Sequence, residues 1–411
     1  MDNSRFLAFT AVGIVLAALA GCGGGGDGGG GGSPDVDSPI PAFTTSSAAI
    51  VTTTNASQIT ANVTGNSTTA AVVGGLSVEK EDGVQSRGSA LVDLAQRLSR
   101  ILRDTVAHAN KANAAPQPMS GVVPVDENEP CDFGNGSVHI SGTLDDGHLG
   151  TLQVSFENCL VVRDRDSDLA TNDSINVNGP ATLRVDAVAS PFPSLTDFTL
   201  SFALLTLRRP GLSLDVGGTP PGTLRTEVDI ATSTVTITAN LVTRDNVTSK
   251  LTKAEGLVVV NVYDNLDMPS LSNTTLLGRV IDQEHGYVDV TTPATLLFAS
   301  VNQDFPSSGQ LLLTGEGNRS IHVTAVSAKL AMLQLDLDGD GLVDNTATLK
   351  WTDLTGPIGV DLGDSDADGM HNSWEAFYGP TNTTDDVDLD GFDSLAEYLA
   401  GTNPNDINSH P

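Results

Sequence analysis

Alternation of apolar and polar residues between Ser137 and Thr352 is the feature that most limits how this chain can fold. A period of two places successive side chains on opposite faces of a strand, so each alternating run predicts a half-buried strand. The first two runs are separated by Asp145-Asp146-Gly147, a typical hairpin turn. About a dozen strands are predicted, over 138–142, 152–156, 182–188, 198–207, 225–230, 234–241, 257–263, 286–290, 294–298, 310–314, 322–326, 330–335 and 346–352.

Short turns containing Gly, Pro or Asp join these runs, and no helical periodicity separates them. Short connections favour antiparallel pairing, because parallel strands need a crossover of a dozen or more residues. The sequence therefore predicts a mainly β protein, with a curved antiparallel meander or sandwich over residues 125–355.

The first 22 residues have the pattern of an export signal. Phe6–Ala20 is a mostly apolar run, shorter than the roughly 20 residues that span a bilayer. It runs into Leu19-Ala20-Gly21-Cys22, which resembles the lipobox of bacterial lipoproteins, where a peptidase cuts before the Cys and the thiol carries a diacylglycerol. The resemblance implies a signal peptide over 1–21, lipidation of Cys22, and an extracytoplasmic protein anchored by lipid in the bacterial cell envelope, at the outer membrane. Ordinary secretory cleavage beside an incidental Cys is the alternative.

Residues 22–43 are predicted to be the lipidated Cys and a Gly-rich tether. Gly23–Gly32 consists of glycine apart from Asp27, and a stretch without side chains to bury behaves as a flexible linker. A phosphate-binding loop is the alternative. It is not favoured, because no strand precedes the glycines and no Gly-Lys-Ser/Thr sequence follows them.

The segment 44–124 is rich in Ser, Thr and Ala and contains two helix signals. Asn55 can cap a short helix that runs toward Thr64. A clearer apolar period of 3.6 residues predicts an amphipathic helix over 89–110, with three arginines on its other side. This helix would pack on the neighbouring sheet, which we favour, or lie on an anionic membrane surface beside the lipid anchor.

Three cysteines occur in the chain, and lipidation of Cys22 would leave Cys131 and Cys159. These two residues flank the first hairpin nearly symmetrically about its turn. In an oxidising extracytoplasmic compartment this spacing predicts a disulfide that closes the hairpin. A metal site or catalytic thiol is the alternative, but no cluster of further ligands lies nearby in the sequence.

Acidic residues are concentrated at the C-terminal end. The chain has 51 Asp and Glu against 20 Lys and Arg, a net charge of −31. From Asp336 to Pro411 there are 17 acidic residues, and Lys350 is the one basic residue. Such a balance excludes a nucleic-acid partner that is bound through phosphate neutralisation, since this needs many basic groups.

These acids fall at a fixed spacing rather than at random. Asp364, Asp366, Asp368 and Glu375 occupy positions 1, 3, 5 and 12 of a loop in which Gly369 is position 6. A calcium ion takes six to eight oxygen ligands at about 2.3–2.6 Å, and alternate residues of a tight loop can point toward one centre. The same spacing returns 22 residues later, with Asp386, Asp388, Asp390, Gly391 and Glu397.

Four further residues complete the two predicted calcium sites. The backbone carbonyls at position 7 would add one oxygen to each shell, and the side chains at position 9 another. These positions are held by Met370, Asn372, Phe392 and Ser394.

Each loop is followed by a predicted short helix, Ser373–Tyr378 and Leu395–Leu399, whereas Gly and Pro precede both loops. The stretch Asp364–Ser409 resembles the thrombospondin type 3-like calcium repeats of bacterial surface proteins, which are EF-hand-like loops without the entering helix. The resemblance implies calcium as the cofactor and an extracytoplasmic setting. It makes residues 356–411 a small tandem calcium-loop module. A dockerin-like pair is the alternative, although dockerins usually end the loop with Asp.

A third acidic stretch contains Asp336, Asp338, Asp340 and Asp344, but Ala347 stands where the position-12 acid would be. It lies between two predicted strands. An Asp-Gly hairpin turn and a weaker calcium site are equally good interpretations.

Motifs for catalysis are not found. The seven histidines form no HExxH pattern, and no GxSxG sequence occurs, so an enzyme is not expected. The preferred hypothesis is a cell-envelope lipoprotein that binds calcium through tandem DxDxDG loops and has a structural or adhesive role. Its partners would be the membrane, through the lipid anchor, and a surface protein or matrix. The alternatives are a carrier of an apolar ligand in the β domain, and an enzyme of unknown class.

Overall fold

The structure of the chain is a computed structural model. It describes residues 39–44, 47–64, 122–130, 136–145, 147, 149–162, 174–189, 194–209, 212–246, 249–264, 271–299, 305–354, 362–366, 368–379, 382–400 and 402–411. The predicted signal peptide, Cys22, most of the tether, the helix over 89–110 and Cys131 lie outside these residues.

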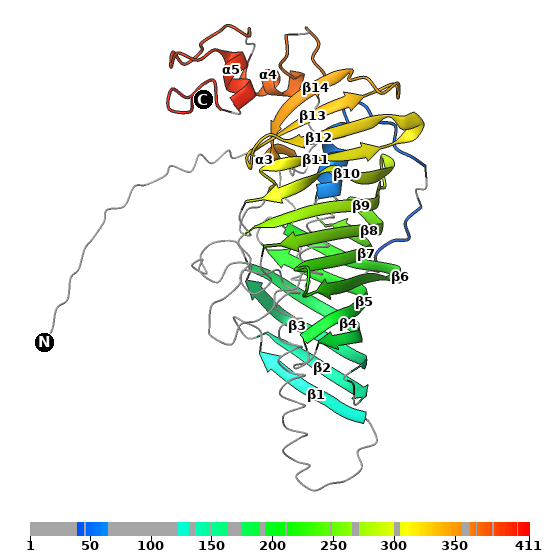
Figure 1. Cartoon of the computed structure of the whole chain (residues 1–411). Helices are drawn as coiled ribbons and strands as arrows, with labels where there is room; N and C mark the ends of the chain where they lie inside the picture. The colour runs from blue at the N-terminus through cyan, green and yellow to red at the C-terminus, as the bar shows by residue number, and fades with distance from the viewer. Residues whose placement is uncertain are drawn as a thin grey trace, which may run out of the picture. The chain divides into compact units, whose positions relative to one another are not determined.

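The β domain is one antiparallel sheet of 14 strands, in which each strand pairs with its neighbours in the sequence (Figure 1). The predicted mainly β fold and the antiparallel meander are confirmed, and the strands form a single sheet rather than the two of a sandwich. The strands are β1 (Val122–Pro130), β2 (Ser137–Asp145), β3 (Gly150–Val162), β4 (Ser174–Ala189), β5 (Ser194–Arg209), β6 (Leu212–Asp229), β7 (Thr234–Asp245), β8 (Leu251–Tyr263), β9 (Ser272–Asp282), β10 (Gly286–Phe298), β11 (Ser308–Thr314), β12 (Ser320–Ala325), β13 (Leu330–Asp336) and β14 (Asn345–Lys350).

The first predicted hairpin forms as expected. β2 and β3 pair antiparallel, with Ile140 opposite Val154. At the turn, the Asp145 carboxylate accepts hydrogen bonds from the backbone N–H groups of Gly147, at 2.9 Å, and Leu149, at 2.8 Å. An Asp at the start of a turn favours the reversal because its side chain satisfies turn amides that strand pairing leaves free.

Many strands are longer than predicted, because shifts of register within them interrupt the apolar–polar alternation from which they were predicted. Two predicted strands, over 286–290 and 294–298, form the single strand β10, whose pairing with β11 shifts between Thr291 and Ala294. Similar shifts interrupt the pairing of β3 through β10 with their neighbours. Bulges of this kind bend a strand and increase its twist, and they interrupt the alternation on which strand prediction depends.

Gly217 shows what one of these bends requires. It lies where the pairing of β5 with β6 shifts and has a φ of 152°. A Cβ atom at this position would lie 2.1 Å from the carbonyl oxygen of Ala203. Only glycine therefore allows the two strands to approach this closely.

The larger of two buried apolar clusters takes residues from all fourteen strands, from Val125 in β1 to Leu349 in β14. An N-terminal segment adds to it, because residues 56–64 are helical and Ala56, Ile59 and Val63 are buried in the same cluster. This spacing is one face of a helix. The predicted helix toward Thr64 is thus confirmed, and it packs in the core of the sheet.

The segment before this helix is tied to the sheet by backbone hydrogen bonds. Ala49 N–H donates to the Tyr287 carbonyl at 2.8 Å, and Glu316 N–H donates to the Ala49 carbonyl at 2.7 Å. The Asn55 side chain accepts from Thr52 N–H at 2.9 Å and donates to the Ile50 carbonyl at 2.9 Å. Asn55 therefore closes the turn that leads into the helix.

The C-terminal part contains three short helices, α3 (Trp351–Leu354), α4 (Asn372–Tyr378) and α5 (Ser394–Ala400). The two helices predicted after the acidic loops are confirmed as α4 and α5. Within the described residues, no helix is long and apolar enough to cross a membrane. Cys159 is buried in β3, and the Cys131–Cys159 disulfide stays a prediction.

Candidate metal centre

The first loop, residues 364–375, closes around the carboxylate of its first residue. Asp364 accepts hydrogen bonds from Asp368 N–H at 3.2 Å and Gly369 N–H at 2.9 Å. Asp368 accepts from Met370 N–H at 2.9 Å. Carboxylate oxygens of Asp364, Asp366 and Asp368 lie within 4.8 Å of one another. The spacing read from the sequence thus brings the three aspartates together.

The second loop, residues 386–397, repeats this arrangement. Asp386 accepts from Asp390 N–H at 3.1 Å and Gly391 N–H at 3.0 Å, and Asp390 accepts from Phe392 N–H at 2.9 Å. Oxygens of Asp386, Asp388 and Asp390 again lie within 4.8 Å of one another. Equivalent residues make equivalent hydrogen bonds in both loops, so the tandem repeat seen in the sequence is also a repeat of structure.

The position-12 glutamates are delivered by the first turns of α4 and α5. Glu397 is completely buried. Burial, and then the charges of Asp388 and Asp390, raise the pKa of Glu397 to about 7. Burial and the charges of Asp366 and Asp368 likewise raise the pKa of Glu375. Both glutamates therefore face the aspartates of their own loop at a distance where like charges repel.

Three carboxylate oxygens in the second loop are buried and have no hydrogen-bond partner. They are Oδ2 of Asp388, Oδ2 of Asp390 and Oε2 of Glu397. The other oxygen of Glu397 accepts from the Thr402 hydroxyl at 3.3 Å. Nearly all buried polar atoms have a partner, and an unpaired buried charge is costly. Asp388 and Asp390 belong to the group of carboxylates within 4.8 Å of one another, and Glu397 is not part of that group. A hard cation at the group would give the two aspartate oxygens a partner, and a donor set of carboxylate oxygens fits a calcium ion.

The remaining predicted ligands are placed differently. At position 9, Asn372 Oδ1 accepts from Ser365 N–H at 3.0 Å, and the Ser394 hydroxyl donates to the Asp385 carbonyl at 2.9 Å. These bonds hold the loops closed, so ligation by the two side chains stays a prediction. The same holds for the carbonyls of Met370, which is buried, and Phe392, which is exposed.

The third acidic stretch forms the turn between β13 and β14. Asp336 accepts from Gly339 N–H at 2.6 Å and Gly341 N–H at 2.8 Å, and Asp344 accepts from Leu337 N–H at 2.6 Å. Burial alone would raise the pKa of Asp336, but these amides hold it below its ordinary value. Oxygens of Asp336, Asp338 and Asp344 lie within 4.8 Å, without Asp340. The hydrogen-bonded turn is the observed structure, and a weaker calcium site there stays a prediction.

A further group of possible ligands, which the sequence did not indicate, lies at the turn from β9 to β10. Asp282, Glu284 and His285 offer atoms within 4.8 Å of one another. Asp282 accepts from the N–H groups of Glu284 and His285 and from the Asn62 side chain. Its oxygens are thus satisfied by the turn and by the helix over 56–64, which is a structural role.

A groove of about 380 Å³ lies on β8–β10 and bears on the hypothesis of an apolar carrier. Its lining includes Leu277 and Val290, but also Glu255 and the ion pair between Arg279 and Asp289, in which Nε and Oδ1 are 2.7 Å apart. Three charged side chains do not match an apolar ligand. The carrier hypothesis stays a prediction without support from this groove.

Comparison of the chain with protein-family models, with curated proteins and with solved structures finds no match.

Proposed function

We propose that this chain is a calcium-binding lipoprotein of the bacterial cell envelope, in which calcium in the second loop stabilises the C-terminal module for a structural or adhesive role. The observation that carries the proposal is the set of three unpartnered, buried oxygens of Asp388, Asp390 and Glu397. Two tandem loops with the same hydrogen bonds support it, as does the lipobox at Cys22.

Calcium fits these loops better than magnesium does. The available ligands are carboxylate oxygens in a short loop, and calcium accepts irregular shells of six to eight oxygens. Magnesium requires a smaller, nearly regular octahedron and keeps several of its waters. The buried Glu397 leaves little room for those waters, which favours the larger ion.

The bound ion would act mainly on stability. Without it, four carboxylates in each loop repel one another, and three oxygens of the second loop are desolvated without compensation. An ion that binds only the folded module stabilises it by RT ln(1 + [Ca²⁺]/Kd). Extracellular calcium modules bind at about 10⁻⁴–10⁻³ M, so the module would be ordered outside the cell.

Calorimetric titration of the chain without residues 1–22 tests this proposal. We expect calcium to bind with a Kd of about 10⁻⁴–10⁻³ M. Glu397→Gln should abolish binding at the second loop, because the amide loses the charge that faces the ion. Glu316→Gln, an exposed residue outside the loops, is the matched control and should bind as the parent does. Equal binding by both variants, or no binding by the parent, would refute the proposal.

A further inference from the structure

β14 is an open edge of the sheet. It pairs with β13 on one side, and within the described residues no strand pairs with its other side. Trp351 N–H, directly after β14, donates to the Lys329 carbonyl at 3.0 Å. Hydrogen bonding alternates along an antiparallel pair, so the backbone groups of Thr346, Thr348 and Lys350 point away from β13. Such a row of outward-pointing backbone groups is a template for another strand unless something covers it.

The two edges of the sheet differ in sequence. The other edge strand, β1, contains Pro124 and Pro130 together with the acids Asp126, Glu127 and Glu129. Proline and charge both discourage the pairing of a further strand. β14 has the sequence Asn-Thr-Ala-Thr-Leu-Lys, in which only the last residue is charged. The sequence thus protects β1 but leaves β14 with little protection of its own.

The calcium-loop module supplies a cover for β14. Tyr398, in α5, is buried, and its hydroxyl oxygen accepts a hydrogen bond from Thr348 N–H at 3.2 Å. This is one of the outward-pointing amides of the edge. The Tyr398 ring also packs edge-on against His371 and Trp374, with 5.4 Å between ring centroids in both cases. One side chain therefore contacts the sheet edge, the first loop and α4.

Tyr398 is also joined to the second loop. It directly follows Glu397, whose unpartnered oxygen faces the aspartates of that loop. An ion held by Glu397 would fix the first turn of α5, and with it the start of the Tyr398 side chain. In the empty loop, repulsion between Glu397 and its neighbours would loosen the same turn.

We propose that the calcium-loop module is a calcium-dependent cap on the β14 edge: the ion in the second loop fixes α5, and Tyr398 then closes the edge at Thr348. This inference rests on the proposed calcium site. Beyond that site, the cap links calcium occupancy of the second loop to the accessibility of the β14 edge, some 50 residues earlier in the chain.

Hydrogen–deuterium exchange of the chain without residues 1–22 tests the link, with calcium or with a chelator. We expect the Thr348 amide, measured at single-residue resolution, to exchange at least about tenfold more slowly with calcium. Tyr398→Phe keeps the ring and its contacts with His371 and Trp374 but removes the acceptor of the Thr348 amide. In this variant calcium should still bind and still slow exchange in α5. The Thr348 amide, however, should exchange as fast with calcium as with the chelator. Tyr287→Phe, in β10, is the matched control and should behave as the parent does.

The outcomes separate the two proposals. If titration shows calcium binding but the Thr348 amide exchanges equally fast with calcium and with chelator, the cap is refuted and the calcium site stands. Retention of the full calcium effect by Tyr398→Phe would also refute the cap. If the parent binds no calcium, the proposed function fails and the cap fails with it.

Discussion

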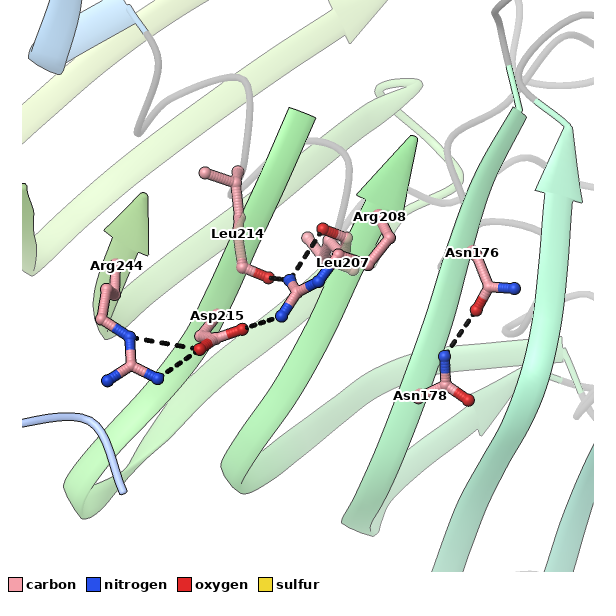
Figure 2. Close-up of polar contacts among 7 residues, drawn as sticks. All are labelled: Asn176, Asn178, Leu207, Arg208, Leu214, Asp215 and Arg244. Carbon is pink, nitrogen blue, oxygen red and sulfur yellow. Dashed lines mark hydrogen bonds and ion pairs between the residues drawn. The ribbon is translucent and has the colours of Figure 1, made fainter. Parts of the chain in front are cut away.

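At the scale of single residues, Asp215 shows how one buried carboxylate can join three strands. It lies on β6 and accepts hydrogen bonds from Arg208 of β5 and Arg244 of β7 (Figure 2). Arg208 also donates to the Leu207 carbonyl at 3.1 Å. Burial alone would raise the pKa of Asp215, but hydrogen bonds from Arg208, Arg244 and Asn246 outweigh it and hold the pKa below its ordinary value.

We predict that Asp215→Asn lowers the free energy of unfolding by about 2 kcal/mol at pH 7, because two arginines lose their shared anion. The partial exposure of Arg208, at 37% of its side chain, keeps the loss below that of a fully buried pair. Urea unfolding measures it. Asp126→Asn, whose side chain is 81% exposed, is the control. An equal loss of unfolding free energy in both variants would show that the ion pairs of Asp215 with Arg208 and Arg244 do not stabilise the fold.

The same variant should show a defined pH dependence. A carboxylate whose pKa is lower in the folded state stabilises the fold above its unfolded pKa of about 3.9, and this stabilisation is lost as pH falls through the folded pKa. The difference in unfolding free energy between parent and Asp215→Asn should therefore be constant near neutral pH and shrink below about pH 4. A difference that grows on acidification would contradict the depressed pKa.

At the scale of elements, the acidic loops illustrate how local spacing becomes geometry. The Asp-x-Asp-x-Asp-Gly pattern places three acids on one side of a tight turn, and the glycine permits a backbone that other residues rarely adopt. Gly369 and Gly391 have φ values of 94° and 97°. Nothing lies within 4 Å of where a Cβ atom on Gly391 would be. The glycine there is thus required by backbone conformation and not by space.

We predict that Gly391→Ala weakens calcium binding at the second loop about 5- to 30-fold, the equivalent of about 1–2 kcal/mol of backbone strain. Calorimetric titration would measure the change in Kd. Gly317→Ala is the matched control, since Gly317 also has a positive φ of 64° and open space around it but lies outside the loops. An unchanged Kd in Gly391→Ala would mean that the ion does not require this turn.

At the scale of the whole molecule, the chain combines a sheet stabilised by apolar burial with a module whose charges oppose its folding. The main buried apolar cluster takes residues from every strand of the sheet. The module has mostly acidic charges, while Phe377, Leu389 and Leu399 are among its exposed apolar residues. Burial is insensitive to metal, whereas the repulsion among carboxylates is not, so the two parts should respond differently to calcium.

We predict that a chelator makes residues 362–411 sensitive to an endoprotease that cuts after Asp and Glu, while strands β2–β14 stay resistant. Calcium should make the module resistant as well. Magnesium at the same concentration should not protect the module, because it fits the loops poorly. Mass spectrometry of the fragments identifies the cut sites. Identical fragments with calcium and with chelator would show that the module needs no ion.

Much of this architecture could be predicted from local sequence. Period-two alternation and turn residues determined the antiparallel meander, and the alternate spacing of the aspartates determined which of them lie close together, because both depend on neighbours along the chain. The lipobox, the disulfide and the helix over 89–110 stay predictions.

Tertiary structure alone decided the long-range contacts. The helix over 56–64 packs in the core of the sheet. The register of three strands places Asp215 within hydrogen-bond distance of two arginines, and the Tyr398 hydroxyl accepts a hydrogen bond from Thr348 on the edge of β14. Each depends on how segments far apart in the chain align. One residue of slip in a strand turns every side chain to the opposite face, and no local pattern records which register is adopted.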